Sequence, residues 1–231
     1  MIIDINVYWR LVWPGGKGVA MKVTKAQVEE NRARIVATAS ALFRERGYDG
    51  VGIAELMAAA GFTHGGFYKH FGSKADLMAE TAATTISRAV ADSAGADLTE
   101  FFKSYVSRAH RDARDAGCTM AALCGDAARQ SEELKATFAA GIDSMITTLE
   151  REVATLSDVD QREARAKMID AFAHAVGAVA LSRACPDDSA LADEILEVCR
   201  EKILASLLPS VHNRQASKGK RISSARRKPA A

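Results

Sequence analysis

Apolar residues recur at every third or fourth position over most of the chain, which is the spacing of an amphipathic helix. In the first such segment, Ile35, Ala39 and Phe43 step along one face, and Gly47 supplies a stop. The helices predicted in this way cover residues 25–46, 53–60, 64–71, 74–93, 98–115, 119–129, 131–155, 159–183 and 189–208.

Capping residues and prolines agree with this division. No proline falls between Pro14 and Pro186, and alanine is the commonest residue between them, so helix is favoured over strand. The fold class expected is therefore all-α. The residues expected to cap helices are Thr63, Ser73 with Asp76 as a capping box, Asp97 or Thr99, Ser131 and Asp158.

Composition narrows the class of protein. A chain of 231 residues with 48% apolar and 26% charged residues can bury a core without disulfide or metal support. No run of 18 apolar residues suggests a membrane span, so no membrane partner is expected. The four cysteines form no CxxC, and no secretory signal is recognisable. We therefore expect a cytoplasmic protein with reduced thiols.

Charge is segregated along the chain. Residues 22–74 carry eight basic and five acidic side chains, whereas residues 75–211 carry 14 basic and 23 acidic ones. This asymmetry favours a polyanionic partner near the N-terminal end. Residues 1–21 fit no pattern, and we interpret them as a disordered leader or as the product of a start codon upstream of Met21. Residues 212–231 hold seven Lys or Arg and no acid, which is typical of a disordered tail.

Residues 53–71 read as a helix, a short turn containing Gly61, and a second helix. This is the layout of a helix-turn-helix, whose second helix enters the major groove of DNA. Phe67 and Phe71, four residues apart, are expected to anchor that helix to the core. The side chains and backbone left facing outward belong to His64, Gly65, Gly66, Tyr68, Lys69 and His70. Donors, a ring and bare backbone suit phosphates and base edges.

The same residues carry a resemblance to a known family. The run from Arg34-Ile35 through Gly47-Tyr48, Ala60-Gly61 and Gly65-Gly66-Phe67-Tyr68-Lys69-His70-Phe71 to Lys74 and Leu77 resembles the TetR/AcrR family of bacterial transcriptional regulators. The resemblance covers about residues 29–78. It implies an N-terminal three-helix DNA-binding domain, here 22–78, and a C-terminal helical domain, here 79–211, that binds a small molecule and dimerises through its last two helices.

The resemblance also implies which residues meet operator DNA. Thr63 matches the cap of the recognition helix; His64, Gly65 and Tyr68 match groove-facing positions, with Lys69 beside them; and His70 and Lys74 match contacts to phosphate or near the groove. One departure concerns the residue before Ile53, where the family has Ser or Thr. This chain has Gly52, so only its backbone can meet a phosphate.

Four further residues are weaker candidates for an effector or redox site. His110 and His174 are single histidines on predicted helices, for which core or surface packing is the commoner explanation. Cys118 and Cys124 could sense oxidants or electrophiles, or could simply pack in a helical core. Three arginines spaced three apart, Arg108, Arg111 and Arg114, are expected to form a solvated helix edge unless one turns inward.

The function predicted is that of a homodimeric repressor of double-stranded operator DNA that a small-molecule effector releases. An activator and a thiol-based sensor remain alternatives. No catalytic motif, metal-ligand spacing or cofactor motif is recognisable, so we expect no enzyme, metal or cofactor. The dimer interface is expected to use Ala171, Ala175, Gly177, Ala178, Ile195, Val198, Ile203 and Leu207, which intramolecular packing could use equally.

Overall fold

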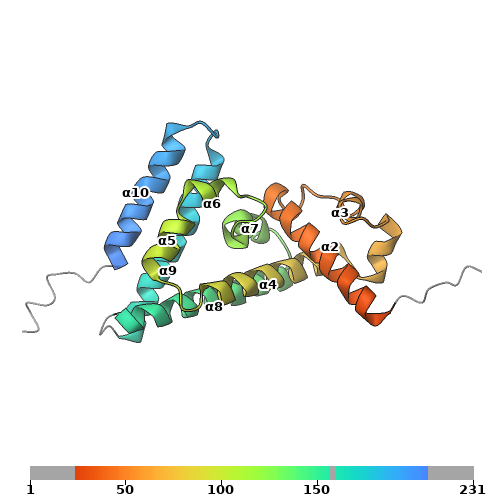
Figure 1. Ribbon diagram of the computed structural model, residues 1–231, viewed down its shortest axis with the longest axis horizontal. Helices are drawn as coiled ribbons and strands as arrows, with labels where there is room; N and C mark the ends of the chain where they lie inside the picture. Colours follow the sequence, from red (N-terminus) through yellow and green to blue (C-terminus); the bar gives the residue numbers. More distant parts are fainter. Residues whose placement is uncertain (1–23, 157–159, 208–231) are drawn as a thin grey trace, which may run out of the picture. The chain divides into compact units, whose positions relative to one another are not determined.

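The computed structural model describes residues 24–156 and 160–207, and within these ranges it contains helices and no strands. The all-α prediction is therefore confirmed. The helices, labelled in Figure 1, are α2 (Lys25–Arg46), α3 (Ile53–Ala59), the 3₁₀ helix η1 (His64–Lys69), α4 (Lys74–Ser93), α5 (Leu98–Tyr105), α6 (Arg108–Asp112), α7 (Thr119–Ala127), α8 (Glu132–Leu156), α9 (Gln161–Ala184) and α10 (Ala190–Leu207). The expected leader and tail lie outside the described residues.

Helix boundaries follow the capping residues. Ser73 and Asp97 accept hydrogen bonds from the backbone N–H groups of Asp76 and Glu100, as predicted. The predicted helix 98–115 is wrong, because the chain leaves helical geometry at Val106 and Ser107 then caps a separate short helix, α6. Asp158 lies outside the described residues, and Asp160 caps α9 instead.

The chain divides into two compact units, the first ending at Ala33 and the second beginning at Arg34. The described part of the first unit is Thr24 with the first residues of α2. There the Thr24 hydroxyl accepts the Gln27 N–H at 3.2 Å, and the side chains from Lys25 to Glu30 are exposed. This segment thus begins with a capped, solvated helical turn.

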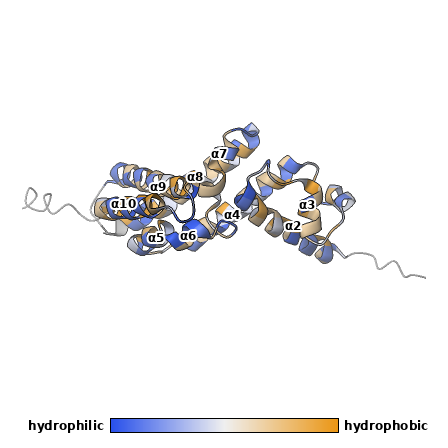
Figure 2. Cartoon of the chain, turned by 90° about the horizontal axis from the view of Figure 1, so that it is seen from above, coloured by the Kyte–Doolittle hydropathy of each residue, from blue (hydrophilic) through white to orange (hydrophobic). Residues whose placement is uncertain are grey.

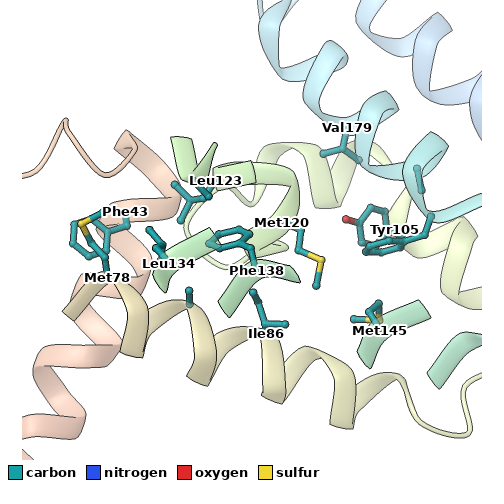
Figure 3. Packing of buried hydrophobic residues seen from close by; sticks show 14 of the residues in the cluster. Phe43, Met78, Ile86, Tyr105, Met120, Leu123, Leu134, Phe138, Met145 and Val179 are labelled. Atoms are coloured by element: carbon teal, nitrogen blue, oxygen red, sulfur yellow. The ribbon is translucent and has the colours of Figure 1, made fainter. Parts of the chain in front are cut away.

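Within the second unit, α4 packs along α8 and α9 packs along α10 (Figure 1). A Cβ atom at Gly141 of α8 would lie 2.4 Å from a methyl carbon of Ile86 in α4, so the glycine permits the close approach of these two helices. Apolar side chains of α4, α5, α7, α8 and α9 fill the space between the helices (Figure 3), among them Ile86, Tyr105, Met120, Phe138, Met145 and Val179.

A buried arginine holds the end of α9. Arg111 is 1% exposed, and its guanidinium donates to the carbonyls of Ser182, Cys185 and Pro186 at 3.2–3.4 Å. It also pairs with Asp112 at 2.7 Å. The expected solvated edge is therefore wrong for Arg111, because these otherwise open C-terminal carbonyls draw the side chain inward.

Hydrophilic and hydrophobic residues mix along each helix (Figure 2). Among the described residues, no helix combines the length and the apolar content that crossing a bilayer requires.

Candidate nucleic-acid interface

The turn between α3 and η1 depends on a glycine in the left-handed region. Gly61 lies in the predicted turn with φ +81°, and its N–H donates to the Ala58 carbonyl at 3.0 Å. The next N–H, that of Phe62, donates to the Met57 carbonyl at 2.8 Å, which closes the end of α3. The half-buried Phe62 ring then packs on the core, with the Arg34 guanidinium 4.8 Å from its centroid.

Two phenylalanines hold η1 in place. Phe67 is fully buried and Phe71 is 3% exposed, and their ring centroids are 5.5 Å apart. Both side chains belong to the core that also contains Leu56 and Met57 of α3, so their predicted anchoring role is confirmed.

Burial of these two rings turns His64, Gly65, Tyr68 and Lys69 of η1 outward. Tyr68 is 62% exposed, with its ring edge-on to that of His64 at a centroid distance of 6.2 Å. We call the exposed set the outer face; its members are Gly52, Thr63, His64, Gly65, Tyr68 and Lys69. It offers an ammonium group, an imidazole, a phenol, a hydroxyl and backbone close to solvent, groups that suit phosphates and base edges.

Residues 35–81, which include the whole outer face, match the family described as "Bacterial regulatory proteins, tetR family". This part of the chain is thus similar to the TetR family of bacterial regulatory proteins.

Named regulators are similar to about a quarter of the chain. It is 39% identical over 57 residues to the HTH-type transcriptional regulator AcrR of Shigella flexneri, a stretch that is 25% of this chain and 26% of that protein. It is 38% identical over 55 residues to the HTH-type transcriptional regulator TtgR of Pseudomonas putida, covering 24% and 26% of the two chains. The match therefore spans about a quarter of these relatives.

Solved structures resemble a much larger part of the chain. A TetR transcriptional regulator from Chloroflexus aurantiacus has a TM-score of 0.62 at 25% identity, covering 78% of this chain and 95% of the other. The reduced form of NemR from E. coli has a TM-score of 0.61 at 18% identity, covering 75% and 95%. The latter likeness shows the fold alone.

Three residues predicted to meet DNA are less open than expected. Gly66 and His70 are half-buried, since Gly66 sits against Met57 and the His70 ring lies between those of Phe62 and Phe71. Lys74 is half-buried too, because its Nζ donates to the Tyr48 carbonyl at 2.6 Å. Thr63 occupies the N-cap position of η1, yet its side chain makes no capping hydrogen bond, which corrects the capping prediction.

The second helix of the motif is a 3₁₀ helix. The N–H of Gly66 donates to the Thr63 carbonyl and that of His70 to the Phe67 carbonyl, both three residues back. The adjacent Gly65 and Gly66 disfavour a longer α-helix, so the tighter turn is adopted over six residues.

Gly52 occupies the N-cap of α3 with φ −84° and ψ 152°, a backbone conformation open to any residue. The Glu55 carboxylate accepts its N–H, and Arg46 pairs with the same carboxylate; the Arg46 hydrogen bond lowers the pKa of Glu55. Half of a capping box is thus present. A Cβ at Gly52 would meet nothing within 4 Å, so a side chain would fit.

His110 is a structural linker in this structure. Its Nε2 accepts the Cys118 N–H at 3.0 Å, so the neutral ring carries its proton on Nδ1, which donates to the Tyr105 carbonyl at 2.7 Å. Burial lowers the pKa of His110, helped by the nearby Arg183 guanidinium and opposed by the bond to Tyr105. Because both ring nitrogens are engaged, the structural interpretation of His110 is favoured over ligand contact.

The cysteines lie beside this linker. Cys118 and Cys124 are free and half-buried, and the buried Tyr105 phenol interacts with Cys118. Burial, with a smaller effect of Cys118, raises the pKa of Cys124 to about 11. A thiol of that pKa carries very little thiolate near neutral pH, which argues against Cys124 as the reactive group.

The remaining candidate, His174, is half-buried on α9. Over residues 24–156 and 160–207, no three His, Cys, Asp or Glu side chains lie close enough together to hold a metal ion.

Sequence reasoning missed the support behind the outer face. The N–H of the fully buried Tyr48 donates to the Asp126 carboxylate at 3.0 Å, 78 positions later in the chain. Gly47-Tyr48 was visible in the family motif, whereas Asp126 lies in a helix without a motif, so no signal in the sequence pairs them.

Substituting Gly52 tests the open N-cap of α3. We expect Gly52→Ser to raise the free energy of unfolding above that of Gly52→Ala by about 1 kcal/mol, since only the serine hydroxyl can cap. The melting temperature should differ by roughly 2–4 °C between these two variants. Equal melting of the two would contradict a free capping position at residue 52.

A pH titration of stability tests the His110 linker. Because the folded-state pKa lies below the unfolded value of about 6.5, the stabilising effect of neutral His110 is complete above that pH. This contribution to the free energy of unfolding is lost as the pH falls toward the folded-state pKa, at a rate of at most about 1.4 kcal/mol per pH unit. Urea titrations between pH 7.5 and 5 should show a weaker pH dependence of the free energy of unfolding for His110→Gln than for the wild type. Equal slopes for wild type and His110→Gln would disprove this role.

Proposed function

We propose that this protein is a DNA-binding transcriptional regulator that reads an operator with the outer face. The observation that carries the proposal is the exposure of Tyr68, His64 and Lys69 on a helix whose own Phe67 is fully buried. A rigidly anchored helix with polar groups outward can enter a major groove without unfolding. The acidic balance of residues 75–211 disfavours that region as the DNA-binding surface.

The regulator acts as a homodimer in this proposal, with α9 and α10 as the interface. An apolar stripe of mostly small residues runs along α9. It steps by three and four from Ala166 through Ile169, Ala173 and Gly177 to Leu181, which is 62% exposed. Its exposed members are Ala166, Ile169, Ala173, Ala180, Leu181 and Ala184. Leu191 and Val198 of α10 are exposed too. Such stripes allow close helix packing between subunits.

The residues of this interface differ from those first expected. Ala171, Ala175 and Ala178 are at most 2% exposed, and Ile203 is 1% exposed, so they pack within their own chain. Of the residues named earlier, Gly177 and Val198 remain suitable for an interface. A Cβ at Gly177 would meet nothing within 4 Å, and Val198 is 47% exposed.

Regulation in this proposal is repression relieved by a small molecule in the C-terminal domain. A two-fold dimer would place its reading helices in major grooves about 34–36 Å apart. An effector that binds better to a dimer with another separation shifts the population away from DNA. The protein would act in the cytoplasm. The alternatives are an activator and a sensor that uses Cys118, and operator-linked reporter output with and without oxidant separates them from the main proposal.

Substitution of Tyr68 tests the outer face. Tyr68→Ala should weaken binding to DNA from upstream of the protein's own gene roughly 5- to 150-fold, since a base contact is worth about 1–3 kcal/mol. Its melting temperature should stay near wild type because the ring is largely exposed. Lys69→Ala should lower the slope of log affinity against log salt by about one per subunit.

The neighbouring Phe67→Ala serves as the contrast. It should lower stability by about 3–5 kcal/mol and lose DNA binding only together with folding. Wild-type affinity in a normally melting Tyr68→Ala and Lys69→Ala pair would show that η1 is not the reading element.

A charge on the α9 stripe tests the dimer. Leu181→Glu should shift the sedimentation profile toward monomer, because two carboxylates would meet near the interface, and helix content should be unchanged since the side chain is exposed. Ala136→Glu, at an exposed position of α8, is the matched control and should stay dimeric. A Leu181→Glu variant that remains fully dimeric at micromolar concentration would exclude this face.

A further inference from the structure

The corner that follows α2 is held from two sides. Tyr48 is fully buried; its N–H donates to Asp126 Oδ2 at 3.0 Å, and its carbonyl accepts Lys74 Nζ at 2.6 Å. Both backbone polar groups of this residue are thus bound by side chains, one from α7 and one from α4. Four residues further on, Gly52 is the N-cap of α3. The position of Tyr48 therefore constrains where the helix-turn-helix starts.

The fit at this corner extends to Gly47. Its φ of +76° favours glycine, and a Cβ there would lie 2.6 Å from Asp126 Oδ2. The carboxylate thus occupies the space that any side chain at residue 47 would need. Asp126 is 28% exposed in its side chain and also pairs with Arg129 at 3.1 Å. Burial, with Asp126 and Cys124 nearby, raises the pKa of Tyr48 far above its ordinary value, so the phenol stays neutral.

The other end of α7 is fixed within the C-terminal domain. The Thr119 hydroxyl donates to the Thr85 hydroxyl of α4 at 2.8 Å, and the Cys118 N–H donates to His110. Between the two ends, Met120 and Leu123 are buried in the core shown in Figure 3. A displacement of α7 at its first turn is therefore carried by a packed helix to Asp126 at its last turn.

We infer that Asp126 is a positioning residue through which α7 sets the helix-turn-helix, so that movements of α7 in the C-terminal domain change DNA binding. The inference rests on the proposed function and names the contact that regulates it. A second link, from Arg44 Nε to the Asp115 carbonyl at 2.8 Å, reaches the loop before α7 and not the helix itself. Asp126 thus supplies a hydrogen bond from α7 itself to the corner.

The test uses the full chain and a double-mutant cycle. Asp126→Ala should accelerate amide exchange about tenfold or more at Tyr48 and through residues 53–70, and change affinity for the upstream DNA at least about fivefold. The control Asp143→Ala removes a carboxylate that pairs with Arg165 far along α8, and it should change neither quantity. Thr119→Val removes the bond at the opposite end of α7.

If α7 acts through Asp126, Thr119→Val should change DNA affinity and exchange over 53–70 in the wild-type background and lose most of that effect in Asp126→Ala. Additive effects, or acceleration limited to the Tyr48 amide with DNA affinity within about twofold of wild type, would overturn the inference. Should Asp126→Ala not fold, the cycle is run with Asp126→Asn, whose uncharged oxygen makes a weaker bond, and additivity there overturns it equally. Absence of DNA binding by the wild type would refute the proposed function, while the exchange cycle would still decide the role of Asp126.

Discussion

The outer face depends on the packing of two phenylalanines, because η1 cannot hold its own conformation. It has six residues, two of them adjacent glycines, and isolated helices of that length are unstable in water. Phe67 and Phe71 supply the missing stability by burying their rings against α3. The two glycines therefore do not loosen the position of the exposed Tyr68, since the buried rings of Phe67 and Phe71 lie on either side of it in the chain. The arrangement separates the residues that fold the helix from those free to meet DNA.

Much of the fold and of the outer face could be predicted from the sequence, because the residues that indicate them act on their immediate neighbours in the chain. Gly61, Ser73 and Asp97 act within three or four residues of their own position, and each takes the predicted role. The spacing of apolar residues likewise predicts the long helices. Within the part of the chain that the structure describes, the exposed members of the motif are also those that the pattern turned outward, apart from Gly66 and His70.

What could not be predicted depends on partners distant in the chain. Lys74 turns toward the Tyr48 carbonyl, and Arg111 turns toward carbonyls more than seventy positions later, although both are cations that a helical pattern leaves solvated. The small residues of α9 show the same limit. Alanines at 171, 175 and 178 share a helix with those at 173, 180 and 184, and only the packing of α9 on its neighbours determines which set is covered.

The contact between Gly141 and Ile86 restricts how α4 can move. The branched side chain of Ile86 lies where a side chain of residue 141 would be, so it fills the gap that Gly141 leaves on the surface of α8. Translation of α4 along its axis would bring the Ile86 side chain into steric overlap with the backbone or neighbouring side chains of α8. A tilt of α4 about Ile86 would keep this contact with Gly141. Helix α4, which follows the helix-turn-helix, can thus tilt about this contact more easily than it can slide along its axis.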